Sequence, residues 1–323
     1  MLDWQAALYY DPLPSLLASV DKAIVFWTGK DLLGKTGDPN SLWALPLAQR
    51  IVSKQQADGS WQYPGGNQKI RSSENYNQIE TFRNVGYLVE MFGFDTSSPV
   101  INKAADFLFS FQTSEGDIRG ILGNQYTPYY TAGMLELLIK AGYTDDPRVR
   151  KAFEWLKAIR QEDGGWAIPL RTHGQKLDII AMNSATLQPD RTQPFSHLVT
   201  GIVLRAYAAH PLYRNSIEAK EAGKLLLSRF FKKDSYPDRG SPDFWLSFTY
   251  PFWFTDLIAA TDTLSKLGFS KDEPQIQKAI RWFTVNQQDD GIWKLKTLKN
   301  QKKFNTDLWL SLSICRVFKR LHS

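Results

Sequence analysis

The chain has 323 residues, a formal net charge of +6 and 43% hydrophobic residues, an ordinary composition for a soluble globular protein. The mild, scattered positive charge excludes a nucleic-acid surface: we interpret the one basic run, residues 294–303, as a solvated loop, with weak attraction to an anionic membrane left open. A single cysteine, Cys315, an N-terminus without a signal-peptide pattern and the lack of any apolar run of about 18 residues predict a cytoplasmic protein without a transmembrane segment.

Apolar periodicity predicts helices along the whole chain, and no strand pattern competes with them. The first stretches are residues 13–33, interrupted by glycines, and residues 41–56. From there two kinds of helix alternate. Weakly charged helices follow long loops, over residues 81–92, 129–141, 195–209, 254–267 and 304–321. More amphipathic helices lie between them, over residues 100–112, 147–160, 215–231 and 274–286. Because few charges imply burial on most sides, we predict two concentric rings with the first kind inside.

A repeated motif follows the amphipathic helices. Residues 55–61 and 287–293 share the pattern Gln-x-x-x-Gly-x-Trp, and residues 112–118 and 160–166 are variants of it. A worn copy lies over residues 229–237. Each glycine is expected to end a helix with positive φ, and each Gln amide to bind backbone groups of a neighbouring helix end. The motif therefore predicts joints between successive helical hairpins.

These motifs and the alternating helices resemble the terpene cyclase and protein prenyltransferase superfamily, which includes squalene–hopene cyclase. The resemblance covers nearly the whole chain. It implies an all-α fold, a single α/α-toroid (α6/α6 barrel) of helical hairpins, with residues 1–323 as one domain. The motifs are specific for this fold but much less specific for a function.

The catalytic signatures of that superfamily are missing from this sequence. The alkene-protonating cyclases carry an Asp-x-Asp-Asp motif, but the acidic pairs here, residues 145–146 and 289–290, precede a helix and belong to a joint. The prenyltransferases hold zinc with Asp, Cys and His, but Cys315 lies within the last helix and the four histidines have no ligand spacing. We therefore predict no metal and no cofactor, and the resemblance does not say whether a partner subunit exists.

A site is expected where the inner helices begin, because their positive dipole ends and free N–H groups meet at one mouth. The residues there are rich in aromatic rings with few polar groups, which is typical of an apolar pocket. The most aromatic stretch, residues 244–254, is expected to be buried as a wall of the cavity. We predict ligand contacts from Arg83, Tyr129, Tyr130, His197, Tyr250, Trp253, Phe254 and Asp307.

Asp256 is the candidate catalytic residue, a proton donor if aromatic burial raises its pKa. The alternative is that Asp256 and Asp307 are first-turn acids that offset the helix dipole, with Thr255 or Thr306 as the cap. The other polar candidates also have structural alternatives. Arg83 could bind a diphosphate or carboxylate of a ligand, or it could form an ion pair within the protein. His197 could be a buried interior histidine without a role in binding.

Three functions remain open at this point. The first is binding or transformation of a hydrophobic, isoprenoid molecule in an aromatic-lined barrel. The second is a saccharide-acting α/α-barrel enzyme with paired carboxylates, such as Asp256 and Asp307, and aromatic rings that stack sugars. The third is a non-catalytic scaffold that presents the barrel mouth to a protein partner.

Overall fold

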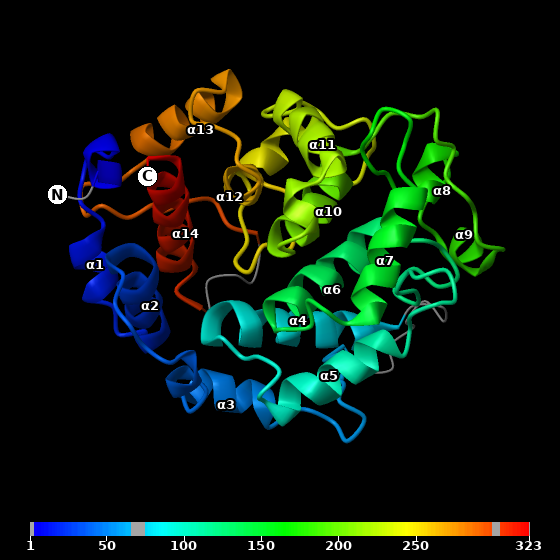
Figure 1. Cartoon of the computed structure of the whole chain (residues 1–323), viewed down its shortest axis with the longest axis horizontal. Helices are drawn as coiled ribbons and strands as arrows, with labels where there is room; N and C mark the ends of the chain where they lie inside the picture. The colour runs from blue at the N-terminus through cyan, green and yellow to red at the C-terminus, as the bar shows by residue number, and fades with distance from the viewer. Residues whose placement is uncertain (1–2, 66–74, 299–303, 323) are drawn as a thin grey trace.

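The structure, a computed structural model that describes residues 3–65, 75–298 and 304–322, is a ring of helices in two layers (Figure 1). No strand occurs in the described residues, and the predicted all-α toroid is confirmed. The inner layer consists of α2 (Lys22–Trp27), α4 (Tyr76–Phe92), α6 (Pro128–Lys140), α10 (His197–Ala209), α12 (Leu257–Lys266) and α14 (Thr306–Leu321). The outer layer consists of α1 (Leu13–Leu17), α3 (Pro46–Val52), α5 (Pro99–Phe109), α7 (Pro147–Ala158), α11 (Ile217–Ser228) and α13 (Pro274–Val285).

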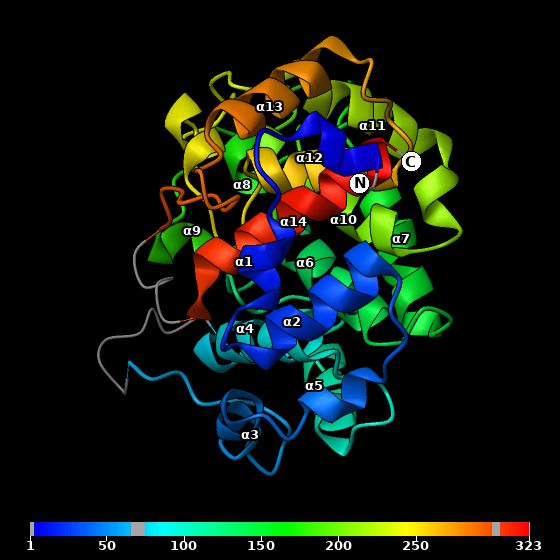
Figure 2. The same ribbon diagram turned by 90° about the vertical axis from the view of Figure 1, so that its left-hand side faces the viewer.

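The inner ring closes on itself. Each inner helix contacts the next one, and α14 contacts α2 and the first 3-10 turn, Asp3–Ala7. Figure 2 shows the two ends of the chain side by side at this closure. An ion pair fastens it, because Arg316 of α14 donates through Nε to Asp31 at 2.8 Å. All residues of α10 except its last are buried, which agrees with the expectation that weakly charged helices lie inside.

The glycine motifs are the joints of the outer ring. Gln112 donates its amide N–H groups to the carbonyl of Gly116 in its own motif, at 2.9 Å, and to the carbonyl of Arg148 in the first turn of α7, at 2.8 Å. Gln55 makes the equivalent bonds, at 3.0 and 2.8 Å, to its own glycine and to the first turn of α5. Each motif thus ties one outer helix to the next, as predicted.

Two of the joints differ from this pattern of hydrogen bonds. Gln287 donates to the carbonyls of Gly291 and Tyr10, and its Oε1 accepts the N–H groups of Tyr9 and Tyr10 at 3.1 Å, which closes the outer ring on the N-terminal segment. Arg160 keeps the bond to its own glycine, at 2.8 Å, and replaces the second bond by an ion pair with α11. The Arg variant therefore preserves the joint.

The motif glycines have φ between 79° and 117°. At Gly116 an added Cβ would lie 2.5 Å from the carbonyl oxygen of Lys151, so both the backbone conformation and the available space require glycine. The predicted positive φ is confirmed at this position, but α5 ends earlier, at Phe109, with Ser110 as its C-cap residue, so the prediction that the glycine ends the helix is wrong.

Each motif also binds the inner ring, which the sequence does not reveal. The backbone N–H of the last motif residue donates to a buried hydroxyl on the following inner helix. The pairs, at 2.9 to 3.1 Å, are Trp61 with Thr81, Ile118 with Thr131, Trp166 with Thr200, and Trp293 with Ser311. In the three Trp copies the indole N–H donates to a carbonyl of the preceding outer helix, at 2.7 Å. Each joint therefore connects three helices.

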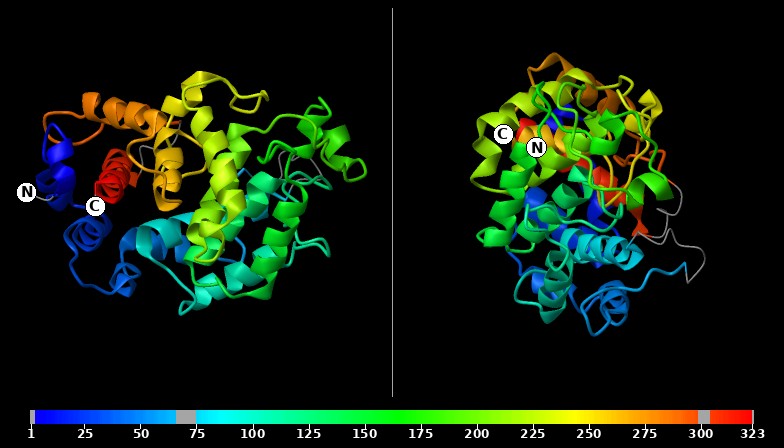
Figure 3. Two further views of the ribbon diagram at one scale, coloured as in Figure 1. Left: turned by 45° about the horizontal axis from the view of Figure 1, so that its top comes forward. Right: turned by 90° about the vertical axis from the view of Figure 1, so that its right-hand side faces the viewer.

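Several predicted boundaries were wrong. The stretch 13–33 is two short helices and a π turn (Thr28–Leu32), and the helix predicted over 41–56 is limited to α3 and a preceding 3-10 turn (Pro39–Leu42). The long loop after the third motif contains α8 (Pro169–Thr172) and α9 (Ile179–Asn183), which lie at the edge of the molecule (Figures 1 and 3). Short 3-10 turns also occur at Tyr213–Asn215 and Pro242–Leu246. Part of the basic run 294–303, residues 299–303, lies outside the described residues.

Candidate functional site

The aromatic stretch 244–254 packs into the ring between inner helices. Tyr250 stacks on Trp309 of α14, with ring centroids 4.9 Å apart and planes 10° apart. Three residues further on, Trp253 contacts α4, where a Cβ added to Gly86 would lie 2.3 Å from the indole. Trp245, Phe248 and Tyr250 are buried, and Phe252, Trp253 and Phe254 are half-buried. The expected burial of this stretch is therefore observed.

A cavity of about 440 Å³ lies where α4 and α6 begin, and we call it the N-terminal pocket. Its rings come from both helices and from the 244–254 stretch. Its lining residues are Pro64, Ile79, Glu80, Phe82, Arg83, Tyr87, Tyr129, Tyr130, Arg239, Thr249, Trp253, Phe254 and Leu298. Five predicted contact residues thus share one cavity: Arg83, Tyr129, Tyr130, Trp253 and Phe254.

Trp253 is the centre of the aromatic cluster. Its ring meets those of Phe82 and Tyr87 edge-on, at centroid distances of 5.3 and 5.6 Å. Tyr129 donates its hydroxyl to the Trp253 carbonyl and lies 4.8 Å from the ring of Tyr130. Burial raises the pKa of the Tyr129 phenol, so this group stays a neutral donor. The cluster is an apolar surface held by specific ring contacts.

Two arginines add positive charge to the N-terminal pocket. The Arg239 guanidinium lies 3.4 Å from the centroid of the Phe254 ring, a cation–π contact. Burial lowers the pKa of Arg239, and no ion pair to this residue occurs among the described residues. Arg83 pairs with Glu80 at 3.6 Å with about half of its side chain exposed, so the predicted structural alternative for Arg83 is realised at the rim of the pocket.

Asp256 is buried, with 1% of its surface exposed. Its Oδ1 accepts the Ala259 N–H at 2.9 Å, so Asp256 is itself the N-cap of α12, and the prediction that Thr255 caps this helix is wrong. Thr255 instead donates to the Leu198 carbonyl. The other carboxyl oxygen of Asp256 has no hydrogen-bond partner in the described part of the chain.

Burial raises the pKa of Asp256 to about 7, against the opposing effect of backbone N–H groups, that of Ala259 first, and of the Arg205 charge. A carboxyl with this pKa is partly protonated at neutral pH and is able to donate a proton. Asp256 is not one of the described residues that line the N-terminal pocket, although Thr249 and Phe254 are. The structure therefore does not place Asp256 against a ligand in that pocket.

The other three predicted contact residues lie elsewhere. His197 is buried, faces Asp234 at 3.6 Å and packs on Trp245 at 4.6 Å, and burial lowers its pKa, so it is an interior histidine. Tyr250 lines a cavity of about 780 Å³ at the opposite mouth of the ring. Asp307 lines a separate cavity of about 650 Å³ beside α14, and Asn305, not Thr306, is the N-cap residue of that helix.

Tyr87 and Arg239 are among the pocket residues that the sequence analysis did not name. Tyr87 lies four residues after Arg83, so helical periodicity alone places both on one face of α4 and would have identified it. Arg239 lies in a loop whose path depends on tertiary packing, and no local signal marks it.

In residues 3–65, 75–298 and 304–322 no group of three or more His, Cys, Asp or Glu side chains is arranged to hold a metal ion. None of the helices in this part of the chain is both long and apolar enough to cross a membrane.

Comparison with known proteins identifies relatives of part of the chain. Residues 78–186, which carry α4 to α9, match the family model of the squalene-hopene cyclase C-terminal domain. A squalene–hopene cyclase from Zymomonas mobilis is 29% identical over 97 residues, which is 30% of this chain and 14% of that protein. The matched segment therefore resembles squalene–hopene cyclases, and the chain covers only 14% of that curated relative.

Solved structures with similar folds include two of different activity. A type II terpene cyclase from Scytonema, solved with geranylgeranyl dihydroxybenzoate, is 11% identical with a TM-score of 0.42 and covers 99% of this chain and 87% of its own. A polysaccharide lyase is also 11% identical with a TM-score of 0.42, and covers 96% of this chain and 98% of its own.

Proposed function

We propose that this chain is a terpene cyclase-like protein that binds a hydrophobic molecule of isoprenoid type in the N-terminal pocket. The observation that carries this proposal is the cluster of six aromatic rings around one cavity of about 440 Å³: Phe82, Tyr87, Tyr129, Tyr130, Trp253 and Phe254. Four of them belong to the segment that matches the squalene-hopene cyclase model. The volume lies within the range of about 300–1,000 Å³ typical of small-molecule pockets.

The chemistry of the pocket suits such a ligand. Burial of apolar chain against the rings contributes about 25 cal/mol per Å² of surface removed from water. The ring faces are able to stabilise a carbocation electrostatically. We include Asp256 in the proposal as the proton donor, since its raised pKa and its free carboxyl oxygen are the properties such a donor needs.

The saccharide alternative is less well supported. It needs two carboxylates at one cavity. Asp307 lines the cavity beside α14, and Asp256 is not one of the described residues that line that cavity. The scaffold alternative predicts a barrel filled by its own side chains; residues 248–254 do fill part of the interior, but they leave the N-terminal pocket open.

Ligand binding is tested by tryptophan fluorescence during titration with geranylgeraniol, with n-hexadecanol as a linear comparison. We expect saturable binding of geranylgeraniol that is at least about tenfold tighter than that of hexadecanol, because loss of ring contacts worth about 1.4 kcal/mol reduces affinity tenfold. Trp253→Leu removes the central ring and should abolish this preference. Trp27→Leu is the matched control, because Trp27 is also half-buried but lines the opposite mouth.

The outcomes separate binding from catalysis. Equal affinity for both alcohols, or equal loss in both variants, would contradict isoprenoid binding in this pocket. If binding is retained in Asp256→Asn while product formation from a polyprenyl substrate disappears, the proton-donor role is supported. If product forms at the wild-type rate in this variant, Asp256 is not the acid. A cytoplasmic location and a single domain over residues 1–323 are part of the same proposal.

A further inference from the structure

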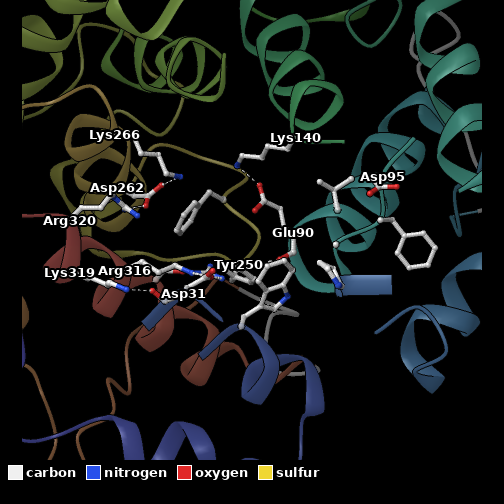
Figure 4. Close-up of a pocket in the computed structure, with 17 residues that line it drawn as sticks. Asp31, Glu90, Asp95, Lys140, Tyr250, Asp262, Lys266, Arg316, Lys319 and Arg320 are labelled. Carbon is white, nitrogen blue, oxygen red and sulfur yellow. Dashed lines mark hydrogen bonds and ion pairs between the residues drawn. The ribbon is translucent and has the colours of Figure 1, made fainter. Parts of the chain in front are cut away.

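Basic side chains gather at the mouth opposite the N-terminal pocket. A pocket of about 450 Å³ lies there between the C-terminal turns of α6, α10, α12 and α14, and we call it the C-terminal basic pocket. It adjoins the cavity of about 780 Å³ shown in Figure 4 and shares with it Lys140, Asp262, Lys266 and Arg320. Five basic residues line it: Lys140, Arg205, Arg214, Lys266 and Arg320. Glu136 and Asp262 are the only acids among its described lining residues.

The two acids of the C-terminal basic pocket are each shared between two bases. Glu136 accepts from Lys140 at 2.6 Å and from Arg205 at 2.7 Å. Asp262 accepts from Lys266 at 2.7 Å and also from Arg320. Even when Glu90, the second partner of Lys140, is counted with the two acids, the five bases keep an excess of two positive charges.

Part of this basic surface has no acceptor. The side chain of Arg205 is 7% exposed, and its Nη1 is buried with no hydrogen-bond partner among the described residues. Arg214 is exposed and forms no ion pair within the described part of the chain. A buried donor without an acceptor is unfavourable, and an anion in the pocket would supply the acceptor.

Helix dipoles alone do not explain this arrangement. Cations at helix C-termini are stabilising, which accounts for Lys140 and Lys266 in the last turns of α6 and α12. Arg214 lies in the 3-10 turn after α10, outside the inner helices, and the dipole effect gives no reason for the unpaired Nη1 of Arg205. Burial, together with the neighbouring charges of Lys140 and Arg320, lowers the pKa of Lys266, and Asp262 opposes this shift.

We propose that the C-terminal basic pocket binds a phosphate group of a small soluble molecule, with Arg205 and Arg214 as its principal donors. Guanidinium groups match phosphate oxygens through paired N–H bonds, and the surrounding lysines add charge. The site is at the other end of the ring from the N-terminal pocket and shares none of its described lining residues. It represents a second binding function of the same barrel.

The test is isothermal titration calorimetry of the full chain with inorganic phosphate and with pyrophosphate at constant ionic strength. We expect one saturable site that binds pyrophosphate more tightly than phosphate. Arg214→Gln should weaken binding by about tenfold, the effect of losing one charge-assisted hydrogen bond. Because Arg214 is exposed and forms no ion pair with the described residues, this variant is expected to fold normally. Arg281→Gln, which removes an exposed charge from α13, should leave binding unchanged.

A second variant tests the buried donor. Arg205→Lys keeps a positive charge beside Glu136 but removes the free Nη1, and we expect it also to weaken pyrophosphate binding. Three results would overturn the proposal: no saturable binding by the wild-type chain, equal loss in Arg214→Gln and Arg281→Gln, or tighter binding of citrate than of pyrophosphate. The last result would show a site for carboxylates.

Discussion

The environment of Asp256 predicts an unusual dependence of stability on pH. Its carboxyl has a pKa of about 7 in the folded chain and an ordinary value of 3.8. Because the folded state holds the proton more tightly than the unfolded state, the favourable contribution of this group is complete below pH 3.8 and is lost as the pH rises to 7. The difference between the two pKa values corresponds to a contribution of at most about 4 kcal/mol to the free energy of unfolding.

The substitution Asp256→Asn isolates this effect, since an asparagine also caps a helix but does not ionise. We expect the free energies of unfolding of the two proteins to be similar near pH 4 and to diverge in favour of the variant by several kcal/mol, up to about 4, at pH 8. The assay is urea denaturation at intervals of pH. The control is Asp178→Asn, which changes an exposed N-cap residue of α9. A difference between wild type and Asp256→Asn that does not vary with pH would refute the reasoning.

Two further predictions concern the joints, and urea denaturation checks both. Gln287→Ala should lower the free energy of unfolding by about 1–3 kcal/mol, because it leaves backbone groups of the ring closure unpaired, whereas the exposed neighbour Gln288→Ala should change it little. Equal effects would contradict the role of the joint. Thr131→Val should lower the free energy of unfolding by about 1–3 kcal/mol, because the backbone N–H of Ile118 loses its acceptor. The control is Thr127→Val, which removes a buried hydroxyl without a partner among the described residues and should be neutral or stabilising. A Thr127→Val variant less stable than Thr131→Val would contradict this account.

The ring itself could be predicted because its signals are local. The motif glycines with positive φ, the Gln amides and the alternation of charged and weakly charged helices all repeat within short segments. The hydroxyls of Thr81 and Thr200, which bind the joints, could not be predicted, because each lies at least twenty residues after its motif residue. Thr and Ser occur throughout the chain, and only the packed structure distinguishes these.

The degenerate copy of the motif, over residues 229–237, differs from the other copies in its spacing. Phe231, three residues after the end of α11, has a φ of 62°, whereas the positive-φ glycines of the other copies lie six or seven residues after their helices. The backbone N–H of Asp234 binds the Gly240 carbonyl, six residues on, whereas the motif spacing elsewhere is shorter. Trp245 donates to the Lys232 carbonyl, as the motif tryptophans do with their own helices. This longer spacing makes the repeat difficult to recognise in the sequence.

The candidate site was predictable to the extent that it depends on helix starts. Arg83, Tyr129 and Tyr130 meet because α4 and α6 are adjacent and begin at the same mouth. Trp253 and Tyr250 separate because the segment between them runs through the ring, so that each faces a different mouth. The C-terminal basic pocket had no sequence signal, because its five bases are distributed from residue 140 to residue 320.

The central claim, that the N-terminal pocket binds an isoprenoid molecule, is tested most directly by photo-crosslinking with a diazirine analogue of geranylgeraniol followed by peptide mass spectrometry. The account predicts labelling of Tyr129, Tyr130 and Trp253 that unlabelled geranylgeraniol suppresses. Labelling confined to exposed peptides such as residues 178–180, or labelling at the pocket that geranylgeraniol does not suppress, would contradict it.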